Sequence, residues 1–194
     1  MKKFKNITND LMMEYIDKLY KGLNKYISSK GLKIDYVVPN LRSGAVPAVY
    51  LANKLNIVKF APIQVKYVNR GNVGCLDILY SSFESLKIEK ENPSFLVVEG
   101  MHDTGDSIKI VLDELKRVYP KSRILYVSLV KTYGSQSFDK IVEYEDHAYV
   151  RASENMSDKD CKKLGLDNAW PIFPWETEQD QTEHLDDLVE NIYF

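Results

Sequence analysis

FLVVEGMHDTGDSIKIVLDEL, residues 95–115, places an apolar segment, a tight turn and a helical pattern in immediate succession. The leading apolar residues are typical of a buried strand, Thr104 and Gly105 indicate a turn, and Ile108 begins a set of apolar residues at helical spacing. A strand followed at once by a helix favours a right-handed βαβ unit and a mostly parallel sheet. Ligands of such sheets bind beyond the carboxyl ends of the strands, so this turn is a candidate site.

The neighbouring segments predict more of the same architecture. IDYVVP (34–39) indicates a short strand, followed by a turn at Gly44 and a helix over 46–54. RILYVSLV (123–130) indicates a further buried strand, and residues 56–68 are rich in β-forming side chains. The sequence therefore predicts an α/β fold with a mostly parallel central sheet flanked by helices.

A helix and a loop are predicted for two of the remaining segments. Residues 8–29 carry apolar side chains at helical spacing, with Thr8 or Asn9 as a possible N-cap and Gly31 just beyond the end. Residues 69–93 are polar and only weakly periodic, which predicts a long loop of the kind that often forms a lid.

The pattern changes after Lys131, where a polar region at 151–168 precedes a final helical pattern. We interpret this part as a cap on the core with a closing helix. We expect one domain over residues 1–194, with a core at about 8–131 and a small hood subdomain with the C-terminal helix at about 132–194.

Composition excludes several classes of protein. Hydrophobic residues make up 44% of the chain and charged residues 28%, which allows a substantial core. The net charge of −2 gives no global reason to expect a nucleic-acid partner. Cys75 and Cys161 do not form a disulfide or zinc pattern, and there is no apolar run of about 18 residues, so we expect a cytoplasmic protein that does not span a membrane.

The turn at residues 103–107 is suited to an anion. Backbone N–H groups at a helix N-terminus have no intrahelical partner and carry partial positive charge, so they can hold a phosphate group. Thr104 and Ser107 add hydroxyl donors, and Gly105 allows a close approach of the backbone. The alternative is an ordinary turn in which Asp103 or Thr104 is only the N-cap.

The same stretch resembles the phosphoribosyl-pyrophosphate signature of type I phosphoribosyltransferases, in which four apolar residues precede two acids, two mostly apolar positions and Asp-Thr-Gly-x-Thr/Ser. The resemblance implies that Glu99 lies near the ribose hydroxyls and magnesium, and that Asp103 is the catalytic acid or base near the purine. Gly100 stands where the family usually has Asp. The phosphate-binding residues that it implies are Asp103, Thr104, Gly105, Asp106 and Ser107.

IDYVVPNLRSGAVPAVYLANKL (34–55) resembles the pyrophosphate loop of the same family. The usual Arg-Gly-Gly appears here as Arg42, Ser43 and Gly44, which the resemblance assigns to pyrophosphate binding. Arg42 supplies a permanent cation with forked donors, and a serine hydroxyl can itself bind an anion.

WPIFPWE (170–176) resembles the end of the purine-binding hood in xanthine–guanine and hypoxanthine phosphoribosyltransferases. The resemblance implies that Trp170 stacks on the base and that the backbone of Pro171 and Ile172 contacts its edge. It also implies that Lys131 donates a hydrogen bond to the base O6. The alternative is that Trp170 and Trp175 anchor the last helix.

Two histidines and a lysine are further candidates within and beside these motifs. His102 lies within the signature at a position that is usually apolar or small, so it faces either ligand or solvent. We interpret His147 as a surface residue and Lys66 as a further candidate for pyrophosphate binding.

The resemblance implies a homodimeric or tetrameric enzyme that transfers the phosphoribosyl group of 5-phosphoribosyl-1-pyrophosphate to a 6-oxopurine base, with Mg²⁺ as cofactor. Two alternatives stay open. One is a phosphoribosyltransferase that uses another base, and the other is a non-enzymatic regulator that keeps the fold and binds nucleotides. Gly100 and Ser43 are the features that favour the regulator.

Overall fold

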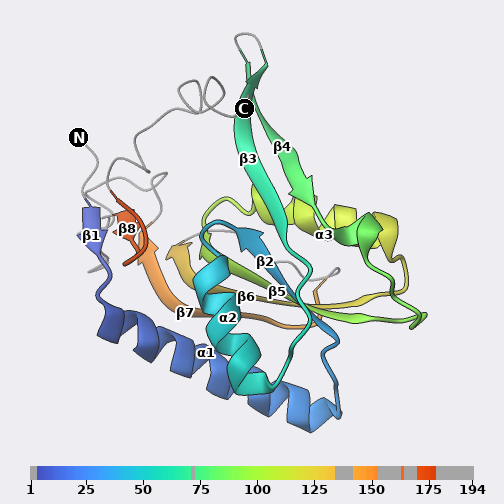
Figure 1. The fold of residues 1–194 in the computed structure, drawn as a ribbon. Coiled ribbons are helices and arrows are strands. Elements are labelled where there is room, and N and C mark those ends of the chain that lie inside the picture. Colours follow the sequence, from blue (N-terminus) through green and yellow to red (C-terminus); the bar gives the residue numbers. More distant parts are fainter. Residues whose placement is uncertain (1–3, 71–72, 134–141, 153–162, 164–169, 178–194) are drawn as a thin grey trace.

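A six-stranded sheet forms the centre of the computed structural model, which describes residues 4–70, 73–133, 142–152, 163 and 170–177. Its strand order is β4-β3-β2-β5-β6-β7, and every neighbouring pair is parallel except the antiparallel β3 and β4 (Figure 1). The prediction of a mostly parallel sheet is therefore confirmed. The strands are β2 (Tyr36–Leu41), β3 (Ile63–Arg70), β4 (Val73–Ser81), β5 (Ser94–His102), β6 (Arg123–Tyr133) and β7 (Glu145–Ala152).

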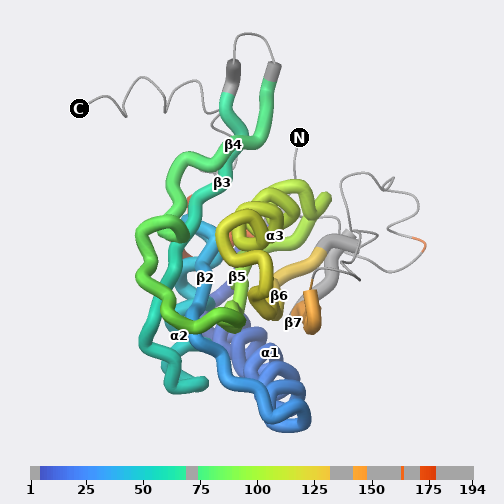
Figure 2. The backbone as a smooth tube through the Cα atoms, turned by 90° about the vertical axis from the view of Figure 1, so that its right-hand side faces the viewer, coloured from blue at the N-terminus to red at the C-terminus, as the bar shows by residue number. Residues whose placement is uncertain are grey.

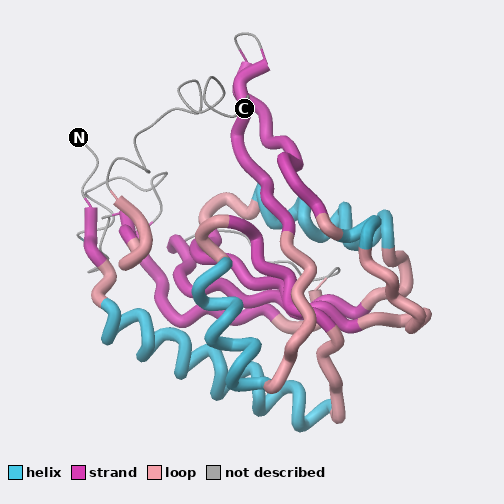
Figure 3. Tube along the Cα trace, viewed as in Figure 1, coloured by secondary structure: helices cyan, strands magenta, loops and turns pink. Residues whose placement is uncertain are grey.

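Helices cover both faces of the sheet (Figure 1, Figure 3). The helices α1 (Asn9–Lys30) and α2 (Ala45–Leu55) pack on one face, and α3 (Asp106–Val118) packs on the other. Strand β5 contributes to both cores, because Leu96 and Val98 face α1 and α2 whereas Phe95 and Val97 face α3. All four side chains are fully buried, which explains the continuous apolar run that marks this strand in the sequence.

The first helix begins and ends where its capping residues predict. Thr8 is the N-cap, and its Oγ1 accepts a hydrogen bond of 3.2 Å from the N–H of Leu11. Gly31 ends the helix in the left-handed region with φ of 58°, a conformation that favours glycine. The apolar residues of α1 lie in the core beside α2, as the helical spacing predicts.

The prediction of a long loop over residues 69–93 is wrong. Val73–Ser81 forms β4, which pairs with β3 in a hairpin that projects beyond the rest of the sheet (Figure 1, Figure 2). Phe83–Ser85 forms a short 3₁₀-helix, η1, whose Phe83 is fully buried. Leu76 and Ile78 pack only partly against the core beneath α3, so the hydrophobic alternation of this strand is weak in the sequence.

Two further features were not foreseen. Strand β7 comes from the region expected to cap the core, yet it adds a parallel edge strand to the central sheet. Strand β1 (Phe4–Asn6) pairs in parallel with β8 (Trp170–Ile172) in a separate two-stranded sheet. The predicted polar region at 151–168 and the predicted terminal helix lie almost entirely outside the described residues. Within the described part of the chain, none of the helices combines the length and apolar character needed to cross a bilayer.

Candidate functional site

A cleft of about 390 Å³ opens at the carboxyl ends of β2 and β5. The turn after β2, the base of the β3–β4 hairpin and the loop that leads into α3 form its walls. His102 and Tyr126 border it from the strands β5 and β6. This is the position at which ligands bind to open α/β sheets.

The loop at residues 103–107 contributes all five of its residues to the cleft. Gly105 has φ of 84° and occupies the N-cap position of α3, so neither Asp103 nor Thr104 is the N-cap residue that the alternative interpretation required. Thr104 Oγ1 donates to the Asp106 carboxylate at 2.9 Å and accepts a long hydrogen bond of 3.4 Å from the Asp106 N–H. Apart from this long bond, the N-cap residue Gly105 provides no side-chain cap for the 13-residue helix α3, whose first residues border the cleft.

The turn after β2 is pressed against β5. A Cβ atom on Gly44 would lie 2.2 Å from the Val98 carbonyl oxygen, so only glycine fits at this position. Ser43 lines the cleft, whereas Arg42 is exposed and its carbonyl accepts a hydrogen bond of 3.0 Å from the N–H of Ala45. The peptide bond between Leu41 and Arg42 is cis. Of the three residues assigned to pyrophosphate, Ser43 alone is part of the cleft wall described above.

Glu99 connects this turn to β5. Its side chain is buried, with the residue only 5% exposed, and one carboxylate oxygen accepts a hydrogen bond of 2.7 Å from Asn40 Nδ2. The other oxygen accepts a longer bond of 3.4 Å from the Ser43 hydroxyl. Asn40 Oδ1 in turn accepts from the Val65 N–H of β3 at 3.4 Å. One buried carboxylate thus connects three neighbouring segments at the edge of the cleft.

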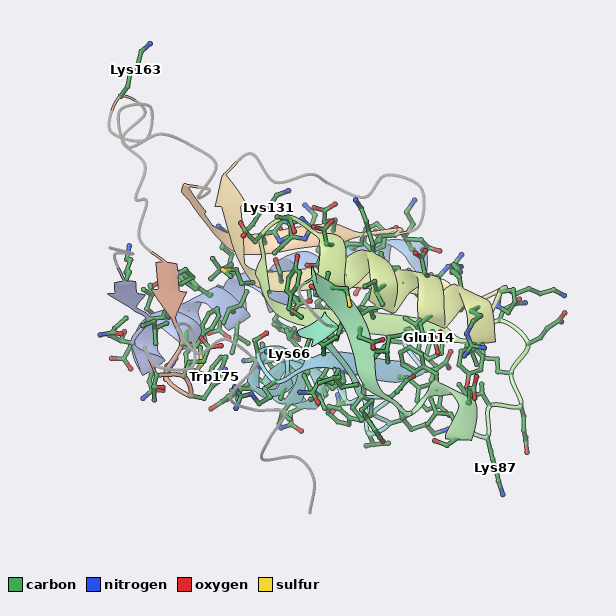
Figure 4. The ribbon with its side chains drawn as sticks, turned by 90° about the horizontal axis from the view of Figure 1, so that it is seen from above. Lys66, Lys87, Glu114, Lys131, Lys163 and Trp175 are labelled. Carbon is green, nitrogen blue, oxygen red and sulfur yellow. The ribbon has the colours of Figure 1, made fainter. Side chains whose placement is uncertain are left out.

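Burial raises the pKa of Glu99 to about 7, because a charged carboxylate loses its hydration there. Hydrogen bonds from Asn40 and Ser43 and the positive charge of Lys66 act in the opposite direction without cancelling this effect. Lys66 also lines the cleft, as its assignment as a candidate pyrophosphate ligand requires (Figure 4). The protonation state of Glu99 therefore changes near neutral pH.

A second buried polar group lies on the α3 face of β5, β6 and β7. His102 is 1% exposed, and its Nδ1 lies 2.9 Å from the hydroxyl of the fully buried Tyr126. The ring centroids of His102 and His147 are 5.3 Å apart. Burial raises the pKa of Tyr126 well above its usual value, so this phenol stays protonated. His102 thus faces the cleft floor.

His147 is mostly buried, so its interpretation as a surface residue is wrong. The residue belongs to β7, whose place in the central sheet was not foreseen. Burial lowers its pKa to about 4, so the ring is neutral near pH 7. We assign its proton to Nε2, which donates to Glu145 Oε1 at 2.9 Å and leaves Nδ1 to accept from the Ser128 hydroxyl.

Lys131 contacts the same carboxylate, with its Nζ 3.2 Å from Glu145 Oε1. Lys131 belongs to β6 and lies next to β7, whereas Trp175 lies near β8, stacked on Phe173 with ring centroids 5.0 Å apart (Figure 4). Trp175 packs against the core beside α1 and α2. The side chain of Trp170 lies outside what the structure describes.

Pro171 and Ile172 are buried in β8, and the Ile172 carbonyl accepts a hydrogen bond of 2.8 Å from the Ile7 N–H.

The structure brings Glu99, Ser43 and the loop at 103–107 together around one cleft. Of the residues assigned to the purine whose side chains the structure describes, Lys131, Pro171 and Ile172 do not line that cleft. Asn40, Tyr126 and Glu145 were missed by the sequence analysis. Asn40 lies within the 34–55 segment, but no role was assigned to it, and Tyr126 and Glu145 lie outside the three motifs.

Comparison with known proteins places the chain in a family. The family model described as "Phosphoribosyl transferase domain" matches residues 5–182. No relative was found among curated proteins.

Solved structures share the fold at low sequence identity. A purine phosphoribosyltransferase from Pyrococcus horikoshii is 20% identical with a TM-score of 0.64, and the match covers 90% of this chain and 95% of that chain. A hypothetical protein from Neisseria gonorrhoeae with bound ppGpp is 17% identical with a TM-score of 0.68 and 98% of both chains covered. A xanthine-guanine-hypoxanthine phosphoribosyltransferase from Helicobacter pylori is 16% identical with a TM-score of 0.61, covering 96% of this chain and 99% of that chain.

Substitution of Glu99 by Gln should change how stability depends on pH. The pKa of Glu99 is raised to about 7 in the folded chain from its ordinary value of 4.5, so between these values the folded state holds a proton that the unfolded state has released. The free energy of unfolding therefore falls as pH rises through this window, by about 3 kcal/mol at most. Glu99→Gln removes this contribution and keeps an acceptor for Asn40.

The measurement is the melting temperature of both proteins from pH 4.5 to pH 8. We expect the variant to gain stability relative to the natural chain as pH rises toward 7. His147 titrates in both proteins, so its opposite contribution cancels in the difference. Glu89→Gln, an exposed carboxylate, is the matched control. Parallel pH profiles for Glu99→Gln and the natural chain would show that Glu99 is not the titrating group.

Proposed function

The chain belongs to the phosphoribosyltransferase family, and we propose that it transfers the phosphoribosyl group of 5-phosphoribosyl-1-pyrophosphate to guanine, xanthine or hypoxanthine. One observation carries this proposal: Glu99, Ser43 and the helix-initiating loop at 103–107 border a single cleft. The loop is assigned to the phosphate of the donor, Glu99 to its ribose and Ser43 to its pyrophosphate. All three lie close enough together to contact a single ligand molecule.

The phosphate is assigned to the loop at 103–107. The amides at the start of α3 carry partial positive charge, and the Thr104 and Ser107 hydroxyls add donors. The pyrophosphate is assigned to Arg42, Ser43 and Gly44, with Lys66 as a further cation at the cleft. This arrangement orients the anomeric carbon between the leaving pyrophosphate and the incoming base.

In the proposed reaction a purine ring nitrogen forms a bond to the anomeric carbon as the bond from that carbon to pyrophosphate breaks. Positive charge develops on the ribose, and Glu99, which borders the cleft, is assigned to stabilise that charge in its negative form. Asp103 borders the same cleft and is assigned to the proton on the purine nitrogen, which it accepts as the new bond forms.

The purine is assigned to Lys131, Trp170 and the backbone of Pro171 and Ile172, as in the hood of 6-oxopurine enzymes. Lys131 would donate to the O6 oxygen, and its ion pair with Glu145 restricts the position of the ammonium group. A 6-oxopurine presents an acceptor there, whereas adenine presents an amino group, so the lysine favours the oxo base.

Magnesium is proposed as the cofactor. Among the described residues, no group of three or more His, Cys, Asp or Glu side chains is arranged to hold a metal ion. Mg²⁺ commonly binds through one or two carboxylates together with substrate phosphates, and Glu99 and Asp103 border the cleft. The residues present fit an ion that arrives with the donor, and this ion would neutralise charge on the leaving pyrophosphate.

A nucleotide-binding regulator on the same fold is the second candidate. The Neisseria gonorrhoeae protein with bound ppGpp matches over 98% of both chains. In the present chain, Gly100 and Ser43 replace the residues usual in the phosphoribosyltransferase motifs. These observations favour a cleft that holds a guanine nucleotide without turnover.

The single domain over residues 1–194, the homo-oligomer and the cytoplasmic location also remain predictions.

Pyrophosphate release tests the proposed activity. We expect release from 5-phosphoribosyl-1-pyrophosphate and Mg²⁺ with at least one of guanine, xanthine and hypoxanthine, at a kcat/KM at least about tenfold above that with adenine or orotate. Release with adenine or orotate alone would assign another base. No release with any base, together with tight binding of ppGpp, would favour the regulator.

Asp103→Asn should keep the fold and lower turnover by roughly 10²–10⁴-fold, because the amide preserves the shape but cannot accept the proton. The measurement is pyrophosphate release together with the melting temperature. Asp113→Asn, at an exposed position further along α3, is the matched control. Unchanged turnover in a stable Asp103→Asn protein would exclude this role for Asp103.

A further inference from the structure

Contact with Ser43, and not an unusual backbone conformation, explains why glycine occupies position 100. Among the described glycines, only Gly31 and Gly105 have positive φ, so position 100 is open to other residues conformationally. A Cβ atom on Gly100 would nevertheless lie 2.6 Å from Ser43 Cβ and 2.9 Å from Ser43 Oγ. It would also lie 3.0 Å from the Ser43 carbonyl oxygen.

Rotation of the Ser43 side chain cannot relieve the closest of these contacts. The Cβ atom of Ser43 is fixed by the backbone, and the turn that carries it is pressed against β5 at Gly44. Removal of the whole Ser43 side chain would remove both of the contacts shorter than 3.0 Å. The contact of 3.0 Å with the carbonyl oxygen of residue 43 would remain, and it requires a shift of a few tenths of an ångström. A side chain at position 100 therefore fits far better beside glycine at position 43, and Gly100→Asp alone cannot add a carboxylate to the cleft without displacing the turn.

The Ser43 hydroxyl lies beside the Glu99 carboxylate at the wall of the cleft. Its oxygen is 3.4 Å from Glu99 Oε1, which is a long and weak hydrogen bond, whereas Asn40 holds Glu99 Oε2 at 2.7 Å. Ser43 and Glu99 both line the cleft. The hydroxyl can turn from Glu99 toward a ligand at small cost, and it can donate or accept.

We infer that Ser43 recognises a hydroxyl group of the ligand's ribose, together with Glu99, and that Gly100 is its obligatory partner. This inference rests on the proposed function, because it assigns a pentose phosphate to the cleft. It gives Ser43 a role in sugar specificity in addition to the pyrophosphate contact of its turn. The pair is one unit: position 43 carries the polar group, and position 100 leaves room for it.

Nucleotide analogues that lack one hydroxyl test the recognition step. Calorimetry would compare GMP, 2′-deoxy-GMP and 3′-deoxy-GMP in the natural chain and in Ser43→Ala. We expect Ser43→Ala to weaken GMP binding by roughly 3–10-fold and to leave one of the deoxy analogues unaffected, because that analogue lacks the group that Ser43 contacts. Ser107→Ala, in the loop assigned to phosphate, is the control and should weaken all three ligands by a similar factor.

Each result separates this inference from the function on which it rests. If Ser43→Ala weakens all three ligands equally, or none of them, Ser43 does not recognise a ribose hydroxyl although the cleft still binds nucleotides. If the natural chain binds neither GMP nor 5-phosphoribosyl-1-pyrophosphate, the proposed function and the inference both fail.

The pairing of the two positions has its own test, which needs no ligand. Gly100→Ala should lower the melting temperature by roughly 5–10 °C, because the new Cβ overlaps Ser43. The double variant Ser43→Gly/Gly100→Ala should regain most of this loss. Ser43→Ala/Gly100→Ala should not, because the contact between the two Cβ atoms at 2.6 Å remains. A Gly100→Ala protein as stable as the natural chain would overturn the pairing.

Discussion

The buried carboxylate of Glu99 is the interaction on which the geometry of the cleft depends. Removing a charged carboxylate from water costs several kcal/mol, and hydrogen bonds to its oxygens must offset that cost. Asn40 and Ser43 provide these bonds, and Asn40 also accepts from the Val65 N–H. The turn after β2, the end of β5 and the start of β3 are therefore held in one arrangement. Without Glu99 the turn would lose the hydrogen bond that the Ser43 hydroxyl donates to β5.

Glu99 and His147, two of the buried titratable groups on the α3 face of the sheet, respond to pH in opposite directions. Burial raises the pKa of Glu99 and lowers that of His147, because both groups favour their neutral forms away from water. A neutral His147 can donate to Glu145, which also contacts Lys131. This network restricts the position of Lys131 beside β7, whereas Glu99 fixes the turn after β2 at the cleft. Perturbed ionisable groups of this kind cluster at functional sites.

Much of the fold could be predicted because strong local signals agree with it. The strand and helix over 95–115 and the capped helix α1 follow from apolar spacing and capping residues. Strand β4 was missed because only one side of the projecting hairpin is partly covered, so its alternation is weak. The β1–β8 pair was missed because its three-residue strands are held by partners far apart in the chain, which no local pattern reveals.

The loops that form the site could be predicted from the sequence, but the contacts between their residues could not. In the sequence, Ser43 and Gly100 are two separate departures from the family motifs. Only their contact in the structure shows that one explains the other. The decisive measurement is a crystal structure of the chain with 5-phosphoribosyl-1-pyrophosphate and Mg²⁺. We expect the 5-phosphate on the amides of residues 104–107 and a ribose hydroxyl within hydrogen-bond distance of both Glu99 and Ser43. A donor bound elsewhere, or a ribose that contacts neither residue, would show that this assignment of the cleft is wrong.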